Sequence, residues 1–449
     1  MKRIVIIGNG IAGITAARHI RKRSDDEITV ISAESDHFFS RTALMYIYMG
    51  HMAFENTKPY EDFFWEKNRI QLMREWVSRV DTENKRLFFA GGRHLEYDVL
   101  IIASGSKSNK FGWPGQDLAG VQGLYSLQDL ELMETHTRKV ERAVIVGGGL
   151  IGIEMAEMLL SRQIPVTFLV REASWMDFAF PAEESAMIDR HVVSHGIDLR
   201  LSTELDRIEA DERGRVRAAV TKDGEEIPCQ FLGLTVGVSP NVDFLQDSGI
   251  ECQRGVMADD MLLTSAPDVY AAGDCVQLRS PKPGRRPIEP LWYTGRMMGE
   301  TIARTVCGEP TTYDPGIWFN SAKFIDIEYQ VYGDIKAKLG EGEKSLYWEH
   351  SSGEKSLRIH YMEADQRVIG FNLMGIRYRH ELCHQWLEEG RTLPFILENL
   401  GAANFDPEFY AQYERELIQL YNDQHPNLPL RLKRRRGLKQ FLSLRRASA

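Results

Sequence analysis

The stretch RIVIIGNGIAGITAARHI at residues 3–20 joins an apolar segment, a glycine-rich turn and a segment with helical spacing of apolar residues. Its first five residues are β-rich and apolar without alternation, which is typical of a parallel strand covered on both faces. Gly8 would permit the tight turn, Gly10 would let the backbone approach a pyrophosphate, and Gly13 would let the helix pack on the strand. The helix N-terminus would offer N–H groups and a partial positive charge to the phosphates. The stretch therefore predicts a dinucleotide-binding unit.

A second apolar strand is expected at residues 28–31, and Glu34 follows it. This glutamate lies about twenty residues after the glycine turn, where a carboxylate can accept hydrogen bonds from both hydroxyls of a ribose. The alternative is a structural turn with a solvated Glu34. Because the turn stands between a strand and a helix, we favour the nucleotide site.

The pattern returns at residues 143–154, AVIVGGGLIGIE, followed by an apolar helix and a strand at residues 165–170. Gly147, Gly149 and Gly152 occupy the places of the three glycines. Two such units in one chain are much more specific than one. We predict that one unit binds a flavin nucleotide and the other a nicotinamide nucleotide.

The second unit's strand ends in Val170-Arg171-Glu172, which we interpret as lacking an acid in the usual ribose position. Arg171 could instead pair with a 2′-phosphate, which favours NADPH slightly. Glu172 would repel that phosphate, and an exposed arginine at a strand end is an equal alternative. The choice between NADH and NADPH stays open.

Composition excludes several classes of protein. The 449 residues are 43% hydrophobic and 27% charged, as in ordinary globular proteins, and the net charge of −9 argues against general nucleic-acid binding. The sequence contains no run of about twenty apolar residues, so we do not predict a membrane-spanning helix. The five cysteines form no CxxC pair, so we expect a reducing, cytoplasmic setting.

Three further motifs follow in order: IIASG at residues 101–105, TVGVSPN at 235–241 and VYAAGDC at 269–275. With the two glycine turns, they resemble the pyridine nucleotide–disulfide oxidoreductase superfamily of flavoproteins over roughly residues 1–310. The resemblance implies FAD and NAD(P)H as cofactors. It also implies that Asp274 binds the ribityl and pyrophosphate region of the flavin nucleotide.

Residues 33–44, AESDHFFSRTAL, resemble the ferredoxin-reductase-like and nitrite-reductase-like branch of that superfamily. The resemblance makes Arg41 a contact of the flavin nucleotide. The redox cysteine pair of the disulfide reductases is absent, so we do not expect disulfide reduction by that route. The lysine that this branch places near the flavin is replaced by Tyr46, whereas Glu154 matches the acid it would pair with.

Residues 288–296, IEPLWYTGR, resemble the helix start that faces the isoalloxazine ring. Trp292 and Tyr293 would either pack against the isoalloxazine ring or pack in a hydrophobic core, and both alternatives stay open. No residue is an obvious acid–base or nucleophilic catalyst, and no metal site is expected. The full set of cofactor-binding candidates is Gly8, Gly10, Ile11, Ala12, Gly13, Glu34, Arg41, Thr42, Val77, Ala103, Ser104, Gly105, Gly273, Asp274, Trp292, Gly147, Gly149, Leu150, Ile151, Gly152, Glu154, Arg171 and Gly237.

The predicted fold is α/β, with two Rossmann-like domains, the second inserted in the first, and a C-terminal α+β interface domain. The FAD-binding domain would comprise residues 1–115 and 242–315, and the NAD(P)-binding domain residues 116–241. The interface domain would cover residues 316–429, before a basic tail at 430–449. Within the interface domain we expect strands at 324–333, 345–362 and 367–374 and helices at 378–389 and 407–421.

Two C-terminal features leave alternatives open. His380, Cys383 and His384 share one predicted helix, where the histidines could serve a metal, but we favour a partly buried helix face. The basic tail interleaves cations with leucines, as in segments that lie on anionic membranes. It could equally dock an acidic electron-transfer protein or be a solvated end.

The leading hypothesis is an FAD-dependent NAD(P)H oxidoreductase that delivers electrons to a carrier protein such as a ferredoxin or rubredoxin. A second hypothesis is an NADH:quinone-type reductase that docks on the membrane surface. A third, of another class, is a non-catalytic flavoprotein that senses nicotinamide redox state. A homodimer is a further expectation.

Overall fold

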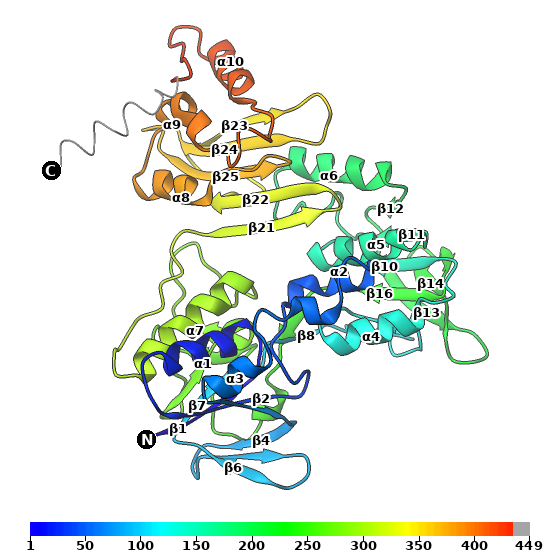
Figure 1. Ribbon diagram of the computed structural model, residues 1–449. Coiled ribbons are helices and arrows are strands. Elements are labelled where there is room, and N and C mark those ends of the chain that lie inside the picture. The colour runs from blue at the N-terminus through cyan, green and yellow to red at the C-terminus, as the bar shows by residue number, and fades with distance from the viewer. Residues whose placement is uncertain (434–449) are drawn as a thin grey trace, which may run out of the picture. The chain divides into compact units, whose positions relative to one another are not determined.

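The computed structural model describes residues 1–433, which divide into two compact units (Figure 1). Unit 1 comprises residues 1–173 and 196–315, and unit 2 comprises residues 174–195 with the described chain from Gly316 onward. No helix within residues 1–433 is long and apolar enough to cross a membrane. Most of the predicted basic tail, residues 434–449, lies outside the described residues, so its membrane and docking hypotheses stay predictions.

Unit 1 contains a five-stranded parallel sheet in the order β19-β7-β1-β2-β3. Its central strand is fully apolar after Arg3 and buried, as expected for a parallel sheet covered on both faces. The helices α1 (Ile11–Arg21) and α7 (Trp292–Val306) pack against each other beside this sheet (Figure 1). The strands are β1 (Arg3–Ile7), β2 (Glu27–Ser32), β3 (Ile70–Arg74), β7 (Val99–Ile102) and β19 (Val269–Ala271).

A second parallel sheet follows in the order β12-β11-β10-β16-β9, and its strands come between β7 and β19 in the chain. The strands β8 (Ser106–Ser108) and β17 (Val238–Pro240) pair where the chain passes from the first sheet to the second and back. This order is the one expected for an inserted domain, although the predicted domain limits stay predictions. The strands are β9 (Val121–Gln122), β10 (Ala143–Val146), β11 (Val166–Leu169), β12 (Asp198–Arg200) and β16 (Phe231–Leu234).

Short helices and small antiparallel or paired strands complete unit 1. Its helices are α2 (Leu44–Tyr48), α3 (Phe63–Lys67), α4 (Leu127–His136) and α5 (Leu150–Ser161). Its remaining strands are β4 (Val77–Asp81), β5 (Arg86–Phe89) and β6 (His94–Glu96); β13 (Leu205–Ala210), β14 (Val216–Thr221) and β15 (Glu226–Pro228); and β18 (Val256–Ala258) with β20 (Val276–Leu278).

Unit 2 is an antiparallel sheet in the order β21-β22-β25-β24-β23 with helices against it. The predicted strands at 324–333 and 367–374 correspond to β22 and β25, and the predicted 345–362 is the hairpin of β23 and β24. The helix expected at 407–421 begins later, at Glu414, because residues 407–410 form a turn and residues 411–413 are irregular. The elements are β21 (Phe319–Phe324), β22 (Ile327–Gly333), β23 (Glu343–Glu349), β24 (Ser356–Met362), β25 (Val368–Met374), α6 (Ala182–Ser194), α8 (His380–Glu388), α9 (Leu393–Asn399) and α10 (Glu414–Gln424).

Helix α6 belongs to unit 2, although its sequence lies inside the stretch expected to form the nicotinamide domain. The Glu184 carboxylate is fully buried and accepts hydrogen bonds from Arg358 Nε at 2.7 Å and Nη2 at 2.8 Å. Asn372 Nδ2 adds a third at 3.2 Å. Removing one partner of such a buried pair leaves an uncompensated charge, so these contacts fix α6 to β24 and β25.

Candidate functional site

The first glycine turn has the shape of a phosphate cradle. Gly8 has φ of +110°, and a Cβ there would lie 2.0 Å from the carbonyl oxygen of Ala103. A Cβ on Gly13 would lie 2.1 Å from Gly8 O, whereas within the described chain a Cβ on Gly10 would meet no heavy atom within 4 Å. Packing therefore excludes side chains at Gly8 and Gly13, and the space at Gly10 admits a ligand. No side chain of residues 1–433 caps α1 at Gly10, which leaves the helix N-terminus able to bind an anion.

The second glycine turn repeats this geometry. Gly147 also has φ of +110°, and its Cβ would lie 2.7 Å from Thr235 O. A Cβ on Gly152 would lie 2.5 Å from Gly147 O, while one on Gly149 would come no closer than 3.9 Å to any described atom. Helix α5 begins directly after Gly149, as α1 begins after Gly10. The predicted pair of nucleotide cradles is thus present in the backbone, with Ile11, Ala12, Leu150 and Ile151 as the first residues of the two helices.

Glu34 and Arg41 form a two-pronged ion pair beyond the carboxyl end of β2. Arg41 Nη1 and Nη2 donate to the two carboxylate oxygens of Glu34 at 2.8 and 2.6 Å. The backbone N–H of Leu127 donates to Glu34 Oε1 at 2.8 Å. The pair is largely shielded from solvent, and although burial alone would lower the pKa of Arg41, the hydrogen bonds and charge of Glu34 raise it. Two residues predicted separately as nucleotide contacts therefore lie together.

Tyr125 links this pair to Asp274. Arg41 Nη1 donates to Tyr125 O at 2.6 Å, and its guanidinium lies 4.5 Å from the centre of the tyrosine ring. Tyr125 Oη donates to Asp274 Oδ2 at 3.1 Å and accepts from the N–H of Ser106 at 2.9 Å. Burial raises the pKa of Asp274, and the hydrogen bond from Tyr125 and the charge of Arg41 only partly oppose it. A polar chain of four side chains, starting at Glu34, thus reaches Asp274.

The loops after β7 and β19 bring their predicted residues to the first glycine turn. Gly273 has φ of +80°, and its Cβ would lie 3.0 Å from that of Ala12, so the Asp274 loop adjoins the start of α1. Ser104 Oγ donates to Asn241 O at 2.7 Å. A Cβ on Gly105 would lie 2.8 Å from Tyr125 Oη. The motifs at residues 101–105 and 269–275 therefore gather around the cradle of the first turn.

The remaining candidates lie in four different places. Thr42 is exposed, with Oγ1 3.1 Å from Ser40 Oγ. Trp292 is 37% exposed at the start of α7, where a helix start was predicted. Val77 is buried in β4 in the core of unit 1, and Gly237 has φ of +86° just before β17. Their cofactor roles stay predictions.

Strand register identifies an acid in the second unit that sequence reasoning misplaced. The N–H of Gly8 donates to Ile31 O, three residues before Glu34, and the N–H of Gly147 donates to Leu169 O, three residues before Glu172. Glu172 therefore takes the place of Glu34, and the interpretation that this position lacks an acid is wrong. The expected strand at residues 165–170 is one residue too long at its end, because β11 ends at Leu169. Arg171 is exposed, and its Nε donates to Glu172 Oε1 at 2.7 Å.

Helix α2, which carries Tyr46, packs against α5, which carries Glu154. Arg162 stacks on Tyr48, with its guanidinium 3.4 Å from the ring centre, and Arg162 Nη1 also donates to Glu134 Oε2 at 2.8 Å. The helix that follows Arg41 is thereby held against the helix of the second cradle.

Thiol chemistry has little support in unit 1. No cysteine precedes Cys229 in the sequence, and no disulfide links the cysteines, all of which lie in the described part of the chain. Cys275, beside Asp274, is fully buried, and burial raises its pKa to about 11. Burial also raises the pKa of Cys229 to about 12. Buried thiols with raised pKa values form little thiolate and react poorly.

The predicted packing of the α8 histidines agrees with the structure. The His380 ring lies between Phe319 and Tyr332, with ring centres 4.6 and 5.3 Å away, and burial lowers its pKa. Cys383 is buried in the core of unit 2. His384 Nε2 lies 3.1 Å from Glu388 Oε1.

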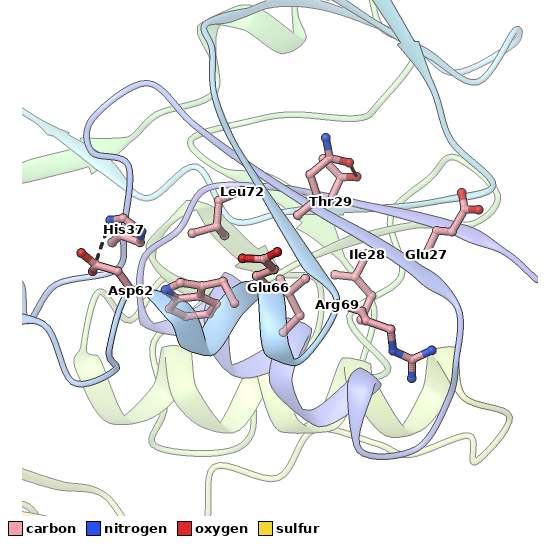
Figure 2. A pocket seen from close by; sticks show the side chains of 11 residues that line it. Glu27, Ile28, Thr29, His37, Asp62, Glu66, Arg69 and Leu72 are labelled. Carbon is pink, nitrogen blue, oxygen red and sulfur yellow. Dashed lines mark hydrogen bonds and ion pairs between the residues drawn. The ribbon is translucent and has the colours of Figure 1, made fainter.

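An open hollow lies along β2 and β3 beside α3 (Figure 2). Its lining includes residues 27–29 at the amino-terminal half of β2, with Trp65 and Arg69. Ligands of open parallel sheets bind beyond the carboxyl ends of the strands, so this hollow is not the expected cofactor site. None of the glycines of the two turns lines it.

Sequence reasoning missed Tyr125, although a local signal marks its place. Ser126 Oγ accepts from the N–H of Asp129, and Asp129 Oδ2 accepts from the N–H groups of Ser126 and Tyr125. This capping box predicts a helix start at residues 126–127. Nothing local shows that the preceding tyrosine reaches Asp274, because that contact spans 149 positions.

Comparison with known proteins agrees with the site. The family model described as pyridine nucleotide-disulphide oxidoreductase matches residues 2–299. The chain is 29% identical to the nitrite reductase [NAD(P)H] of Bacillus subtilis over 74% of its length, but it spans only 41% of that protein. It is 28% identical to the ferredoxin–NAD(+) reductase component of the biphenyl dioxygenase system of Paraburkholderia xenovorans, over 80% of this chain and 87% of that one.

The same fold occurs in a solved NAD-dependent persulfide reductase from A. fulgidus. The TM-score is 0.81 at 23% identity, and the match covers 94% of this chain and 84% of the other. At this level of identity the likeness concerns the fold alone.

Proposed function

Because the chain belongs to the pyridine nucleotide-disulphide oxidoreductase family, we propose that it passes electrons from NADH through bound FAD to a small redox carrier protein of the ferredoxin or rubredoxin class. Members of this family are oxidoreductases, and the cofactors of this chain are FAD and NAD(P)H. The observation that carries the proposal is the pair of glycine turns with matching backbone geometry in one polypeptide.

The residues around the first turn fit the flavin nucleotide. The open space at Gly10 and the uncapped start of α1 suit a pyrophosphate. Glu34 suits the adenosine ribose, and Asp274 suits the ribityl region. Arg41 holds Glu34 in place and would supply a cation to the flavin nucleotide. These assignments keep the roles expected from the sequence, with Tyr125 added as the side chain that fixes Asp274.

The second turn fits the nicotinamide nucleotide, and Glu172 favours NADH over NADPH. A carboxylate at this position accepts hydrogen bonds from the ribose hydroxyls, whereas it repels a 2′-phosphate. The exposed Arg171 is already paired with Glu172, so its charge is not available in full to a phosphate.

Bound FAD would supply the redox chemistry, accepting a hydride from the nicotinamide and passing electrons to the acceptor, and the residues of the two glycine turns would align the two rings. The N-terminus of α7 supplies N–H groups and a partial positive charge where Trp292 begins the helix. The buried Glu289, bonded by Arg285 at 2.6 and 2.8 Å, fixes the loop before that helix. Its carbonyl accepts from Thr294 Oγ1 at 2.9 Å, which ties the loop to the first turn of α7.

A carrier protein is the acceptor class that this chain supports best. The ferredoxin reductase component is matched over nearly its whole length, whereas the match to the nitrite reductase covers less than half of it. Residues 1–228 contain no cysteine, so this stretch supplies no redox disulfide. A cytoplasmic location, inferred from cysteine usage, and a homodimer remain part of this proposal.

Anaerobic stopped-flow mixing tests the first half-reaction. The visible absorbance of bound FAD should bleach rapidly with NADH and at least tenfold more slowly with NADPH. Ferredoxin or rubredoxin added to the reduced enzyme should then restore the absorbance. Protein that holds FAD but is bleached by neither nucleotide would contradict the reductase proposal. Bleaching without reoxidation by any carrier would contradict only the acceptor.

A further inference from the structure

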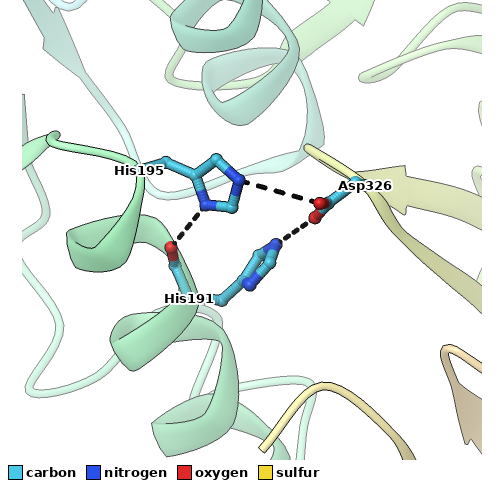
Figure 3. Close-up of side chains that lie close together, drawn as sticks. All are labelled: His191, His195 and Asp326. Atoms are coloured by element: carbon cyan, nitrogen blue, oxygen red, sulfur yellow. Dashed lines mark hydrogen bonds and ion pairs between the residues drawn. The ribbon is translucent and has the colours of Figure 1, made fainter. Parts of the chain in front are cut away.

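Three potential metal ligands meet in unit 2, far in sequence from the glycine turns. His191 lies in the last turn of α6, His195 is the residue directly after that helix, and Asp326 lies in the turn between β21 and β22 (Figure 3). Their ligand atoms all lie within 4.8 Å of one another. Among residues 1–433, no other group of three histidine, cysteine or acidic side chains does so.

Both imidazoles face the same carboxylate. His191 Nε2 lies 2.5 Å from Asp326 Oδ1, and His195 Nε2 lies 3.7 Å from Asp326 Oδ2. The two ring centres are 4.4 Å apart. The spacing of four positions places the rings on one side of the helix, and the turn brings the acid to that side. The two Nε2 atoms therefore face the two oxygens of one carboxylate (Figure 3).

A hydrogen bond fixes the orientation of His195. Its Nδ1 lies 2.9 Å from the backbone carbonyl oxygen of His191 and can donate a hydrogen bond to it, and in the neutral imidazole this tautomer presents the Nε2 lone pair as a metal ligand. Ligating histidines characteristically donate their second ring N–H to a carbonyl or carboxylate, because this bond sets the tautomer and the ring orientation.

The two sides of the cluster rest on a packed scaffold. His191 is 5% exposed, whereas the Asp326 side chain is 68% exposed, so the cluster has a buried base and an opening to solvent. Phe324 is fully buried against Trp175, with ring centres 5.0 Å apart, and fixes the end of β21. Ile325 has φ of +60°, a conformation that a β-branched residue adopts only when its surroundings impose it.

A simple ion pair explains this arrangement less completely than a bound cation. One carboxylate can neutralise one protonated imidazole, but a second imidazole beside the first then gains little. A divalent ion satisfies both neutral imidazoles and the carboxylate together. Two histidines and one carboxylate are a ligand set that Zn²⁺ accepts, with water in the fourth position.

We propose that His191, His195 and Asp326 bind a divalent transition-metal ion of the Zn²⁺ class, with water completing a tetrahedral site. The ion would connect the end of α6 to the β21–β22 turn and stabilise unit 2. This site stands apart from the proposed electron transfer, because none of its ligands belongs to either glycine turn. Its failure would leave the oxidoreductase proposal unchanged.

Titration calorimetry with Zn²⁺, on tag-free holoenzyme freed of metal by a chelator, tests the site. The wild type should bind one ion per chain. Asp326→Asn and His195→Gln should each weaken binding by at least about tenfold, since even the loss of an outer-shell partner costs 10–100-fold in metal sites. Zn²⁺ should raise the Tm of the wild type by more than that of either variant. Both side chains are partly exposed, so the variants should fold and keep their flavin absorbance.

The chain supplies a matched control on α8. His380 and His384 have the same spacing, and Glu388 lies beside them, but their ring centres are 5.8 Å apart and His380 is packed between aromatic rings. The double variant His380→Gln/His384→Gln should retain full Zn²⁺ binding. Zn²⁺ binding of wild-type strength in Asp326→Asn and His195→Gln, or loss of binding in the α8 variant, would overturn the proposal. Absence of binding to the wild type would overturn it as well.

Discussion

The two glycine turns have the same backbone conformation, but the acids that follow them, Glu34 and Glu172, have different surroundings. In the first turn Glu34 is clamped by Arg41 and by the N–H of Leu127, in a chain that reaches Asp274. In the second, the partner of Glu172 is its own neighbour Arg171, which is 75% exposed. The turn geometry depends on local glycines, whereas the surroundings of each acid depend on distant segments. We therefore expect a tightly held nucleotide at the first turn and an exchanging one at the second.

The largest effects should come from an alanine at the third glycine of each turn. Gly13→Ala and Gly152→Ala each push a Cβ to within 2.5 Å of a backbone carbonyl oxygen, which costs about 3 kcal/mol or more. Gly13→Ala should yield protein without FAD, and Gly152→Ala should keep FAD but slow its bleaching by NADH at least about a hundredfold. Flavin absorbance and stopped-flow bleaching measure the two effects.

Gly91→Ala is the control for these variants, because within the described chain its Cβ would meet nothing within 4 Å. It should leave FAD content and bleaching unchanged. If Gly152→Ala lost FAD and Gly13→Ala kept it, the assignment of the two cradles would be reversed.

The next largest contrast should come from neutralising the two matched acids. Glu34→Gln leaves the partly buried Arg41 without its counter-charge. We therefore expect the free energy of FAD binding to become less favourable by about 2 kcal/mol, which corresponds to roughly thirtyfold weaker binding. Glu172→Gln should leave FAD binding unchanged and raise the KM for NADH about five- to tenfold. Fluorescence titration of the apoprotein with FAD and steady-state kinetics measure these changes. Equal effects of both substitutions on FAD affinity would remove the distinction between the turns.

Much of the fold could be predicted because its decisive elements are local. Each strand–turn–helix unit is formed by about twenty consecutive residues. Within such a stretch the glycine positions and the apolar runs directly indicate the backbone geometry. Alternation likewise predicts β22, β23, β24 and β25 of unit 2, but it does not predict β21. The placement of α6 was beyond such reasoning, since it depends on the contact of Glu184 with Arg358, 174 positions away.

The site was predictable to the same extent. Motif positions identify the glycines of the first turn, Glu34, Arg41 and Asp274. The structure brings these residues together at one end of the first sheet. Glu172 was misplaced because a strand end cannot be fixed to one residue without its pairing partner. Tyr125 has no motif of its own. The meeting of Asp326 with the α6 histidines required a hairpin turn and a distant helix to be placed together.

A smaller, pH-dependent effect should come from Asp274 beside the first turn. Because burial raises the pKa of Asp274, the FAD-free fold favours its protonated form. The stabilisation is therefore present below the ordinary pKa of 3.8 and is lost as pH rises through the raised value. The Tm of wild-type apoprotein minus that of Asp274→Asn should thus fall as pH increases from about 4 to about 8. A difference that stays constant or rises over this pH range would contradict the prediction.

The smallest effect should come from Arg171→Gln. The arginine is exposed, and exposed ion pairs contribute about 0–1 kcal/mol, so kcat/KM for NADH should change less than about threefold. NADPH should remain the poorer donor, because the carboxylate of Glu172 would still repel a 2′-phosphate. Lys222→Gln, which removes another exposed cation paired with Glu204, serves as the control. A tenfold fall in kcat/KM for NADPH in Arg171→Gln alone would mean that Arg171 binds a 2′-phosphate, and the preference for NADH would have to be abandoned.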